Sequence, residues 1–441
     1  MLRVVSLSDE ELPVGWAGRV AFADEGRGFA YRPGQVLVGG RRGLEEAQRI
    51  LPSESLDDIE AVFPERESGQ FHLLRIARDP LEVVHDLLLE GVVAQPNHVL
   101  FAHCGSCCCP HPSARWQGAF HGSPFHGSPF HASPFHASPF HASPFHASGF
   151  EATGRRSSSA RPAEAPPRSG SPSSTSSGSA TGAPRIAVLD TGLATEEFRP
   201  AALRGLTVDQ RHGERPDEDG EGRLDPVAGH GTFIAGLLSR LAPGCALVTE
   251  RVLTTLGEGD EATIASRIDA LGATGDLDLL NLSFGAYTVM RPHVLEAAVR
   301  RVQAAGTVVV ASAGNDSTCH PASPAALPGV VSVGALGPDG PAPFTNHGPW
   351  VRACAPGTDV VAPFFDGFDG SSHAPPGELD PDDFSGWARW SGTSFAAPTV
   401  VAALAREMVR SGVSAREAVA RIIDAPGLLR LPGLGTVVNI Q

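Results

Sequence analysis

Three polar residues mark the ends of short apolar runs that have the composition of buried strands. Asp190 ends the run that begins at 185, Ser283 lies near the end of LDLLNLSF (277–284), and Asn315 follows TVVVASA (307–313). In an open parallel sheet, ligands bind beyond the carboxyl ends of the strands, where such side chains gather. These positions therefore predict a site along one edge of a sheet.

Two further polar residues open apolar helical segments. His230 begins His-Gly-Thr-Phe-Ile-Ala-Gly, and Ser394 lies in Gly-Thr-Ser-Phe-Ala-Ala-Pro. A serine at a helix N-terminus lies at the positive end of the helix dipole, and its backbone N–H has no partner within the helix. That N–H and a nearby Asn amide can both stabilise a developing oxyanion. Taken singly, such residues are more typical of turns and helix caps; taken together, they indicate catalysis.

The elements that must hold these residues alternate along the chain from 184 to 441. The apolar runs that predict strands lie at 185–189, 246–252, 277–284, 307–313 and 330–336, and the amphipathic stretches that predict helices lie at 264–271 and 293–304. Nearly continuous apolar strands joined by helices indicate a parallel sheet covered on both faces. We therefore predict one α/β domain with a doubly wound parallel sheet over residues 184–441.

Three blocks in this region resemble the signature of the subtilisin family. They are Asp-Thr-Gly at Asp190, His-Gly-Thr at His230 and Gly-Thr-Ser-x-Ala-x-Pro at Ser394. Their order along the chain differs from the triad order in chymotrypsin-like enzymes and α/β-hydrolases. Further matching blocks are NLSFG (281–285), SAGN (312–315), FTNHGPWVRACAPG (344–357) and GLGTVVN (433–439). The resemblance covers nearly all of residues 184–441.

The resemblance implies a serine endopeptidase with a definite set of site residues. Ser394 would attack the scissile carbonyl, His230 would transfer the proton, and Asp190 would orient the imidazole. Asn315 and the Ser394 N–H would stabilise the oxyanion. The residues implied to line the primary specificity pocket are Ser283, Gly285, Ala313 and Gly314.

The sequence also departs from the family pattern before and after the histidine. Phe233 stands where the family commonly has His, which is a change in packing. The connection from 240 to 245 is too short for the calcium-binding loop of many subtilisins, so we expect no cofactor, with calcium open only at another site. The acidic residues Asp219, Glu221 and Asp225 favour a solvated loop over a cation site.

The N-terminal region, residues 1–103, predicts a small separate domain. Its expected elements are a strand (35–38), a helix (44–51), two strands (59–63 and 71–76), a helix (81–89) and a strand (98–101). The order β-α-β-β-α-β is ferredoxin-like. Segments 31–38 and 92–99 also resemble the first and last strands of the inhibitor-like prodomains of subtilisins. This resemblance implies a zymogen in which the chain after Phe101 lies in the cleft.

Between the two domains, residues 104–183 predict a disordered linker. It contains six Phe-His-Gly/Ala-Ser units from Phe120 onward, of which the first five end in proline and the sixth, at Phe145, ends in glycine. So little branched apolar content cannot offset the entropy of ordering the chain. The soft ligands that leave a zinc or copper site open, as an alternative to oxidisable linker thiols, are His103, Cys104, Cys107, Cys109 and His111.

The overall composition narrows the classes of function. A formal net charge of −15 argues against a nucleic-acid partner, which would need a basic face. No run of about 18 apolar residues occurs, so we expect no membrane span. The N-terminus lacks the features of a secretion signal, and seven cysteines do not make a disulfide framework. We therefore favour a cytoplasmic location.

The leading prediction is a serine endopeptidase that acts on polypeptides and is made as a zymogen, with residues 1–103 as its intramolecular inhibitor. One alternative is a peptide-binding protein with an inactive protease fold. The intact set of Asp190, His230, Ser394 and Asn315 counts against that alternative. A second alternative is a peptide or metal-binding repeat segment that is carried, or released, by its own protease.

Overall fold

The computed structural model describes ten stretches of the 441-residue chain. They are residues 18–23, 29–51, 56–63, 71–102, 160–166, 183–206, 213–220, 222–288, 290–370 and 383–440. The cysteine cluster and the Phe-His repeats of the expected linker lie outside these stretches. Among the described helices, none combines the length and the apolar character needed to cross a membrane.

The N-terminal domain has the β-α-β-β-α-β order expected from the sequence. Its elements are β1 (Ala21–Phe22), β2 (Ala30–Gly39), α1 (Gly40–Ile50), β3 (Leu56–Ala61), β4 (Phe71–Ile76), α2 (Pro80–Leu89) and β5 (Ala94–Ala102). The helix α2 begins where Asp79 accepts hydrogen bonds from Leu81 N and Glu82 N, with Pro80 in the first turn. Both helices pack on the sheet through one apolar cluster that includes Val38, Leu74 and Leu87.

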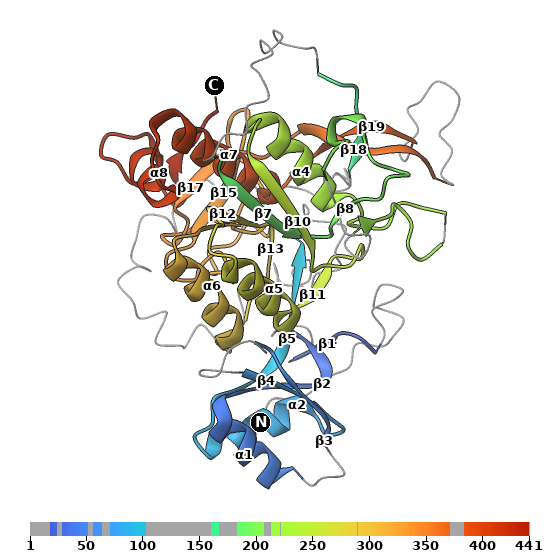
Figure 1. The fold of residues 1–441 in the computed structure, drawn as a ribbon, viewed down its shortest axis with the longest axis vertical. Helices are drawn as coiled ribbons and strands as arrows, with labels where there is room; N and C mark the ends of the chain where they lie inside the picture. Colours follow the sequence, from blue (N-terminus) through green and yellow to red (C-terminus); the bar gives the residue numbers. More distant parts are fainter. Residues whose placement is uncertain are drawn as a thin grey trace.

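One strand, β5, joins the two domains. Within the N-terminal domain it pairs with β2, and further along it pairs with β11 (Glu258–Asp260) and β13 (Phe284–Gly285) of the second domain. Figure 1 shows β5 rising from the blue N-terminal domain towards the larger domain. The strand begins earlier than the predicted 98–101 because residues 94–96 pair with β2.

The second domain is built on a parallel sheet, as predicted. The strands run in the order β10-β7-β12-β14-β15-β17-β21, with the short β20 and β16 added antiparallel. Figure 1 places α5 and α6 on one side of this sheet and α4 and α7 on the other. The doubly wound α/β prediction is therefore confirmed.

The bounds of the sheet strands are as follows. They are β7 (Arg185–Asp190), β10 (Ala246–Arg251), β12 (Leu279–Leu282), β14 (Val308–Ser312), β15 (Val331–Gly337), β16 (Gly340–Pro341), β17 (Ala353–Pro356), β20 (Arg430–Leu431) and β21 (Gly435–Val437). The helices are α4 (His230–Leu241), α5 (Glu261–Ala273), α6 (His293–Ala305), α7 (Thr393–Ser411) and α8 (Ala415–Ile422), with a short 3-10 helix at Ala201–Leu203. A two-stranded parallel ribbon joins β8 (Leu193–Ala194) to β9 (Gly213–Glu214).

A further small sheet lies beside α4. It consists of β18 (Val360–Asp369), β19 (Asp383–Trp390) and β6 (Arg161–Pro162), in that order. The third strand comes from the segment expected to be a disordered linker, so that expectation needs correction at this point. A Pro-containing stretch cannot fold alone, but it can occupy the edge of an existing sheet.

Candidate active site

The end of strand β7 and the start of helix α4 bring Asp190 and His230 together. His230 Nδ1 lies 2.7 Å from Asp190 Oδ1, and both side chains are fully buried. The residue before the histidine, Gly229, has φ +80°, and a Cβ there would lie 2.1 Å from the Phe364 ring. Only glycine therefore fits at the start of this helix. Asp190 Oδ1 also accepts the backbone N–H of Thr191 at 2.8 Å.

The other imidazole nitrogen is poised to accept a proton. When Nδ1–H donates to Asp190, Nε2 carries a lone pair. Nε2 is buried and has no hydrogen-bond partner among the described residues. The Ser394 hydroxyl donates instead to the Ser283 carbonyl oxygen at 3.1 Å. The predicted Asp–His pair is thus in place, whereas no described contact joins Ser394 to the imidazole.

The predicted oxyanion donors lie together at the N-terminus of α7. Asn315 Oδ1 accepts the Thr393 backbone N–H at 2.9 Å and the Thr393 hydroxyl at 2.8 Å. These two bonds fix the amide so that its NH₂ group faces away from Thr393. Ser394, the next residue, lies in the first turn of α7, where backbone N–H groups lack helical acceptors.

The four residues expected to line the specificity pocket follow strands β12 and β14 or lie on β13, and one of them contacts Ser394. Ser283 Oγ donates to the Ser394 carbonyl oxygen at 3.0 Å. Gly285 pairs with Phe101 of β5, and Ala313 follows the end of β14. Gly314 has φ +107°, and a Cβ there would lie 2.3 Å from an atom of the neighbouring Asn346 side chain.

Comparison with known proteins identifies the family. Residues 182–424, more than half of the chain, match Peptidase_S8, the Subtilase family. The chain belongs to the subtilase family. It is 30% identical over 266 residues to a thermophilic serine proteinase of Bacillus sp. (strain AK1), an alignment that covers 57% of this chain and 58% of that protein.

A second relative is subtilisin DY of Bacillus licheniformis. It is 29% identical over 210 residues, which cover 44% of this chain and 72% of that protein. A solved structure of a cold adapted subtilisin-like serine proteinase matches 58% of this chain and 88% of that chain, with 22% identity and a TM-score of 0.45. This subtilase spans about half the length of the first curated relatives it matches.

A hydrogen-bonded group that the sequence did not single out holds the 313–318 loop of this subtilase. Asn346 Nδ2 donates to the Ala313 carbonyl, and Asn346 Oδ1 accepts from Asp316 N and Thr318 N. The Tyr287 hydroxyl donates to Asp316 Oδ2 at 2.7 Å. Burial and the Asp316 charge raise the pKa of Tyr287 well above its usual value, so it remains a donor. The block FTNHG (344–348) was the one sequence signal for this group.

A second missed residue, Glu214, lies fully buried beneath the first turn of α4. Its carboxylate accepts the backbone N–H groups of Gly229 at 3.0 Å and Thr232 at 3.1 Å, and the Thr232 hydroxyl at 2.6 Å. Burial, with a smaller contribution from Asp190, raises its pKa, and hydrogen bonds from Thr232, Thr191 and Gly229 oppose the rise. Only its position at the end of β9, against the first turn of α4, reveals its role.

The hydroxyl groups of Thr232 and Thr191 bear on the protonation state of Glu214. The Thr232 hydroxyl already accepts Ala194 N at 2.7 Å, and the Thr191 hydroxyl accepts Gly231 N at 2.9 Å. Each hydroxyl thus keeps its own proton available for Glu214. This set of donors suits an ionised carboxylate at the positive end of α4, and it opposes the rise in pKa that burial causes.

The acidic loop before His230 brings Asp217, Asp219 and Asp225 together, with ligand atoms all within 4.8 Å of one another. Backbone N–H groups occupy two of these carboxylates, with Gly220 donating to Asp217 and Glu218 donating to Asp225. Burial raises the pKa of Asp225. Glu221, which the sequence analysis grouped with Asp219 and Asp225, lies outside the described residues.

Proposed function

We propose that this subtilase is a serine endopeptidase that uses Asp190, His230 and Ser394 as its triad and is made as a self-inhibited zymogen. The observation that carries the proposal is the buried 2.7 Å contact between Asp190 and His230, next to a serine in the first turn of a helix. A carboxylate that fixes the imidazole tautomer is what a histidine needs to act as a general base towards a hydroxyl.

The proposed reaction uses each group once in acylation and again in deacylation. Rotation of the Ser394 hydroxyl from the Ser283 carbonyl towards Nε2 lets His230 take its proton as Oγ attacks the substrate carbonyl. Asn315 and the Ser394 N–H stabilise the oxyanion. His230 then protonates the departing amine, water enters, and the same steps in reverse order release the acid and restore Ser394.

Self-inhibition is supported by the position of β5. The strand lies between β11 and β13 and runs antiparallel to both, with Ala102 N donating to the Gly257 carbonyl at 2.9 Å. Leu100 and Ala102 face the main core of the catalytic domain and are 1% and 3% exposed. An extended segment held by main-chain pairing, with alternate side chains in pockets, is how a protease holds a peptide.

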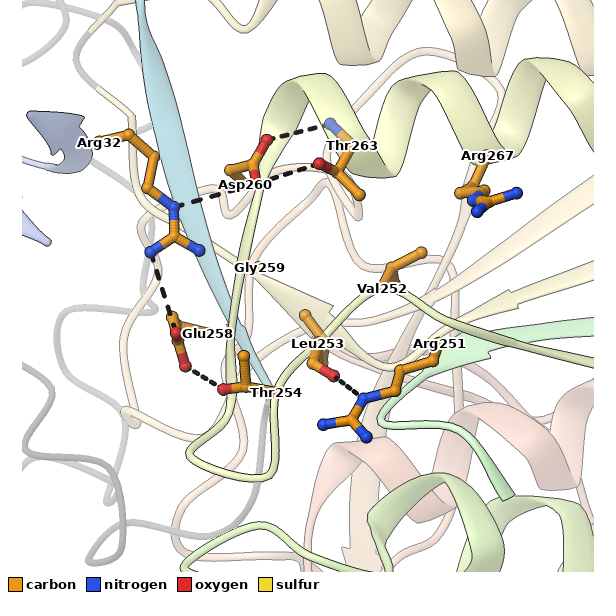
Figure 2. Close-up of a pocket in the computed structure, with 10 residues that line it drawn as sticks. All are labelled: Arg32, Arg251, Val252, Leu253, Thr254, Glu258, Gly259, Asp260, Thr263 and Arg267. Carbon is orange, nitrogen blue, oxygen red and sulfur yellow. Dashed lines mark hydrogen bonds and ion pairs between the residues drawn. The ribbon is translucent and has the colours of Figure 1, made fainter. Parts of the chain in front are cut away.

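Polar contacts also fix the N-terminal domain on the catalytic domain. Glu261, at the start of α5, accepts from Gln95 at 2.6 Å and contacts His98 at 2.6 Å, and all three side chains are buried. Figure 2 shows Arg32 of β2 reaching Glu258 and Asp260 of β11, at 3.8 and 3.9 Å. These residues border a cavity of about 370 Å³ whose lining includes none of Asp190, His230 and Ser394.

Access to the catalytic residues is closed in this arrangement. Asp190, His230 and Ser394 are all fully buried. Activity therefore requires cleavage of the chain beyond Ala102 and departure of the N-terminal domain. A tethered inhibitor keeps a high local concentration, so cleavage alone does not suffice until this domain dissociates or is degraded.

The test compares the unaltered chain with Ser394→Ala and with the control Ser239→Ala. The unaltered chain and the control should release a fragment ending shortly after Ala102, hydrolyse peptides and react with a fluorophosphonate. Ser394→Ala should stay full length and unlabelled while keeping its fold by circular dichroism, because the hydroxyl adds little to packing. Hydrolysis by Ser394→Ala at the unaltered rate would refute the triad. Full activity of an uncleaved chain would refute the zymogen proposal alone.

A further inference from the structure

The short strand β6 pairs with the edge of β19 on the catalytic domain. Arg161 pairs with Arg389 and Pro162 with Ala388 of β19, and Ala163 N donates to the Trp387 carbonyl at 3.2 Å. The preceding residue, Ala160, is 3% exposed and belongs to the main apolar core. Figure 1 shows this sheet beside α4, far from the N-terminal domain.

The direction of β6 relates it to the catalytic centre. Because the pairing is antiparallel, the chain arrives at β6 from the Trp390 end of β19 and runs away from it. The Trp390 indole packs edge-on against the His230 imidazole, with ring centroids 5.4 Å apart. Ser394 follows Trp390 after only three intervening residues. The strand β6 therefore leads away from the triad.

The strand β5 has the complementary direction. Its pairing of Phe101 with Gly285 and Ala102 with Phe284 directs the chain towards Ser283, whose carbonyl accepts the Ser394 hydroxyl. One segment of the chain thus runs to the catalytic serine and another runs away from it, in the same N-to-C sense. A single extended polypeptide passing through the site would have this direction on both sides of its scissile bond.

We propose that the outer edge of β19 binds the carboxyl-side part of a polypeptide substrate, and that residues 160–163 occupy this edge in cis as a strap. The proposal rests on the peptidase function proposed above. Main-chain pairing to a strand edge accepts many sequences, which suits a surface that must receive varied substrates. With two residue pairs, the strap is weak enough for a substrate to displace, but its attachment to the domain gives it a high local concentration.

The proposal requires the strap to stay with the catalytic domain after maturation, so the mature fragment is expected to begin before Ala160. A fragment that began just before Arg185 would lack the strap, so N-terminal sequencing of the mature fragment is the first measurement. A start beyond Ala163 would overturn the proposal.

The decisive experiment uses mature enzyme from Ala160→Asp, Ala163→Pro and the control Glu164→Ala. The first variant places a charge at a buried position, and the second removes the N–H donated to Trp387 without altering the core. Glu164 is exposed and follows the paired residues. Each enzyme is assayed with two substrates. The first is a peptide that extends on both sides of the scissile bond, and the second is a peptide that carries p-nitroanilide directly after the scissile bond.

For both strap variants, we expect KM for the extended peptide to fall about three- to tenfold, the equivalent of one or two lost main-chain hydrogen bonds. KM for the p-nitroanilide should not change, because that substrate does not reach β19. Equal changes with both substrates, or no change with either, would overturn the strap while leaving the peptidase function intact. No hydrolysis of either substrate by the unaltered mature enzyme would refute the peptidase function and the strap with it.

Discussion

Replacing Glu214 by Gln tests whether a buried carboxylate anchors the catalytic helix. The side chain keeps its size, but an NH₂ group now faces donors such as Gly229 N–H or the Thr232 N–H and hydroxyl. A buried hydrogen bond to a charged group that is lost in this way costs about 1.5–3 kcal/mol. For a domain of this size, that corresponds to a fall in Tm of roughly 3–12 °C.

The same change should reach the chemistry through the first turn of α4, which begins with His230. One such hydrogen bond corresponds to about 1.4 kcal/mol of transition-state stabilisation, and its loss lowers kcat about tenfold. KM should stay unchanged, because Glu214 is buried away from the β5 path. Asp at this position keeps the charge and should recover part of the lost kcat.

The assay measures kcat, KM and Tm of mature Glu214→Gln beside Glu197→Gln, which removes an exposed carboxylate from a neighbouring loop. The control should match the unaltered enzyme, since its ion pair with Arg215 is at the surface. If Glu214→Gln kept its Tm and kcat, the carboxylate would not be an ionised anchor. If KM rose while kcat stayed the same, the residue would act on substrate binding instead of on His230.

The remaining predictions concern the oxyanion site, calcium and pH. Asn315→Ala should lower kcat about 10² to 10³-fold with little change in KM, the magnitude known for the matching donor in subtilisin itself; an unchanged kcat would remove Asn315 from the site. Excess chelator should lower Tm only slightly, because four residues separate α4 from β10; a large fall would point first to Asp217, Asp219 and Asp225. Hydrogen bonds from Ser411 and Arg410 lower the pKa of Glu407 below its usual 4.5. Its stabilisation is therefore present above that pH and is lost as the pH falls through the folded-state pKa. Glu407→Gln should lower Tm at pH 7 and have little effect near pH 3; an equal effect at both would contradict this.

The sequence predicted those candidate site residues that can be recognised by their position at the end of a strand or at the start of a helix. Asp190 at a strand end and His230 and Ser394 at helix starts follow from apolar periodicity and from the order of the three signature blocks. The parallel sheet followed from its short apolar runs. These features are local or repeat along the chain, so one sequence is enough to find them.

Residues that act through distant partners were missed for a physical reason. Glu214 lies in a polar stretch with no motif, and its importance comes from donors in α4 and at Thr191 that only the fold brings close. The strand β6 has two residues in a Ser- and Pro-rich region, and only the edge of β19 makes it a strand.

The N-terminal domain also stabilises two helices of the larger domain. Asn97 Oδ1 accepts the Ala262 N–H at the start of α5, and Gln95 Oε1 accepts the His293 N–H at the start of α6. Both are N-terminal caps, each typically worth about 1 kcal/mol, and here another domain supplies them to two helices that pack against each other. In the proposed zymogen mechanism, departure of that domain returns both N–H groups to water. Inhibition and helix stability would then depend on the same buried strand, β5, and the proposed active form would also be the less stable form of the fold.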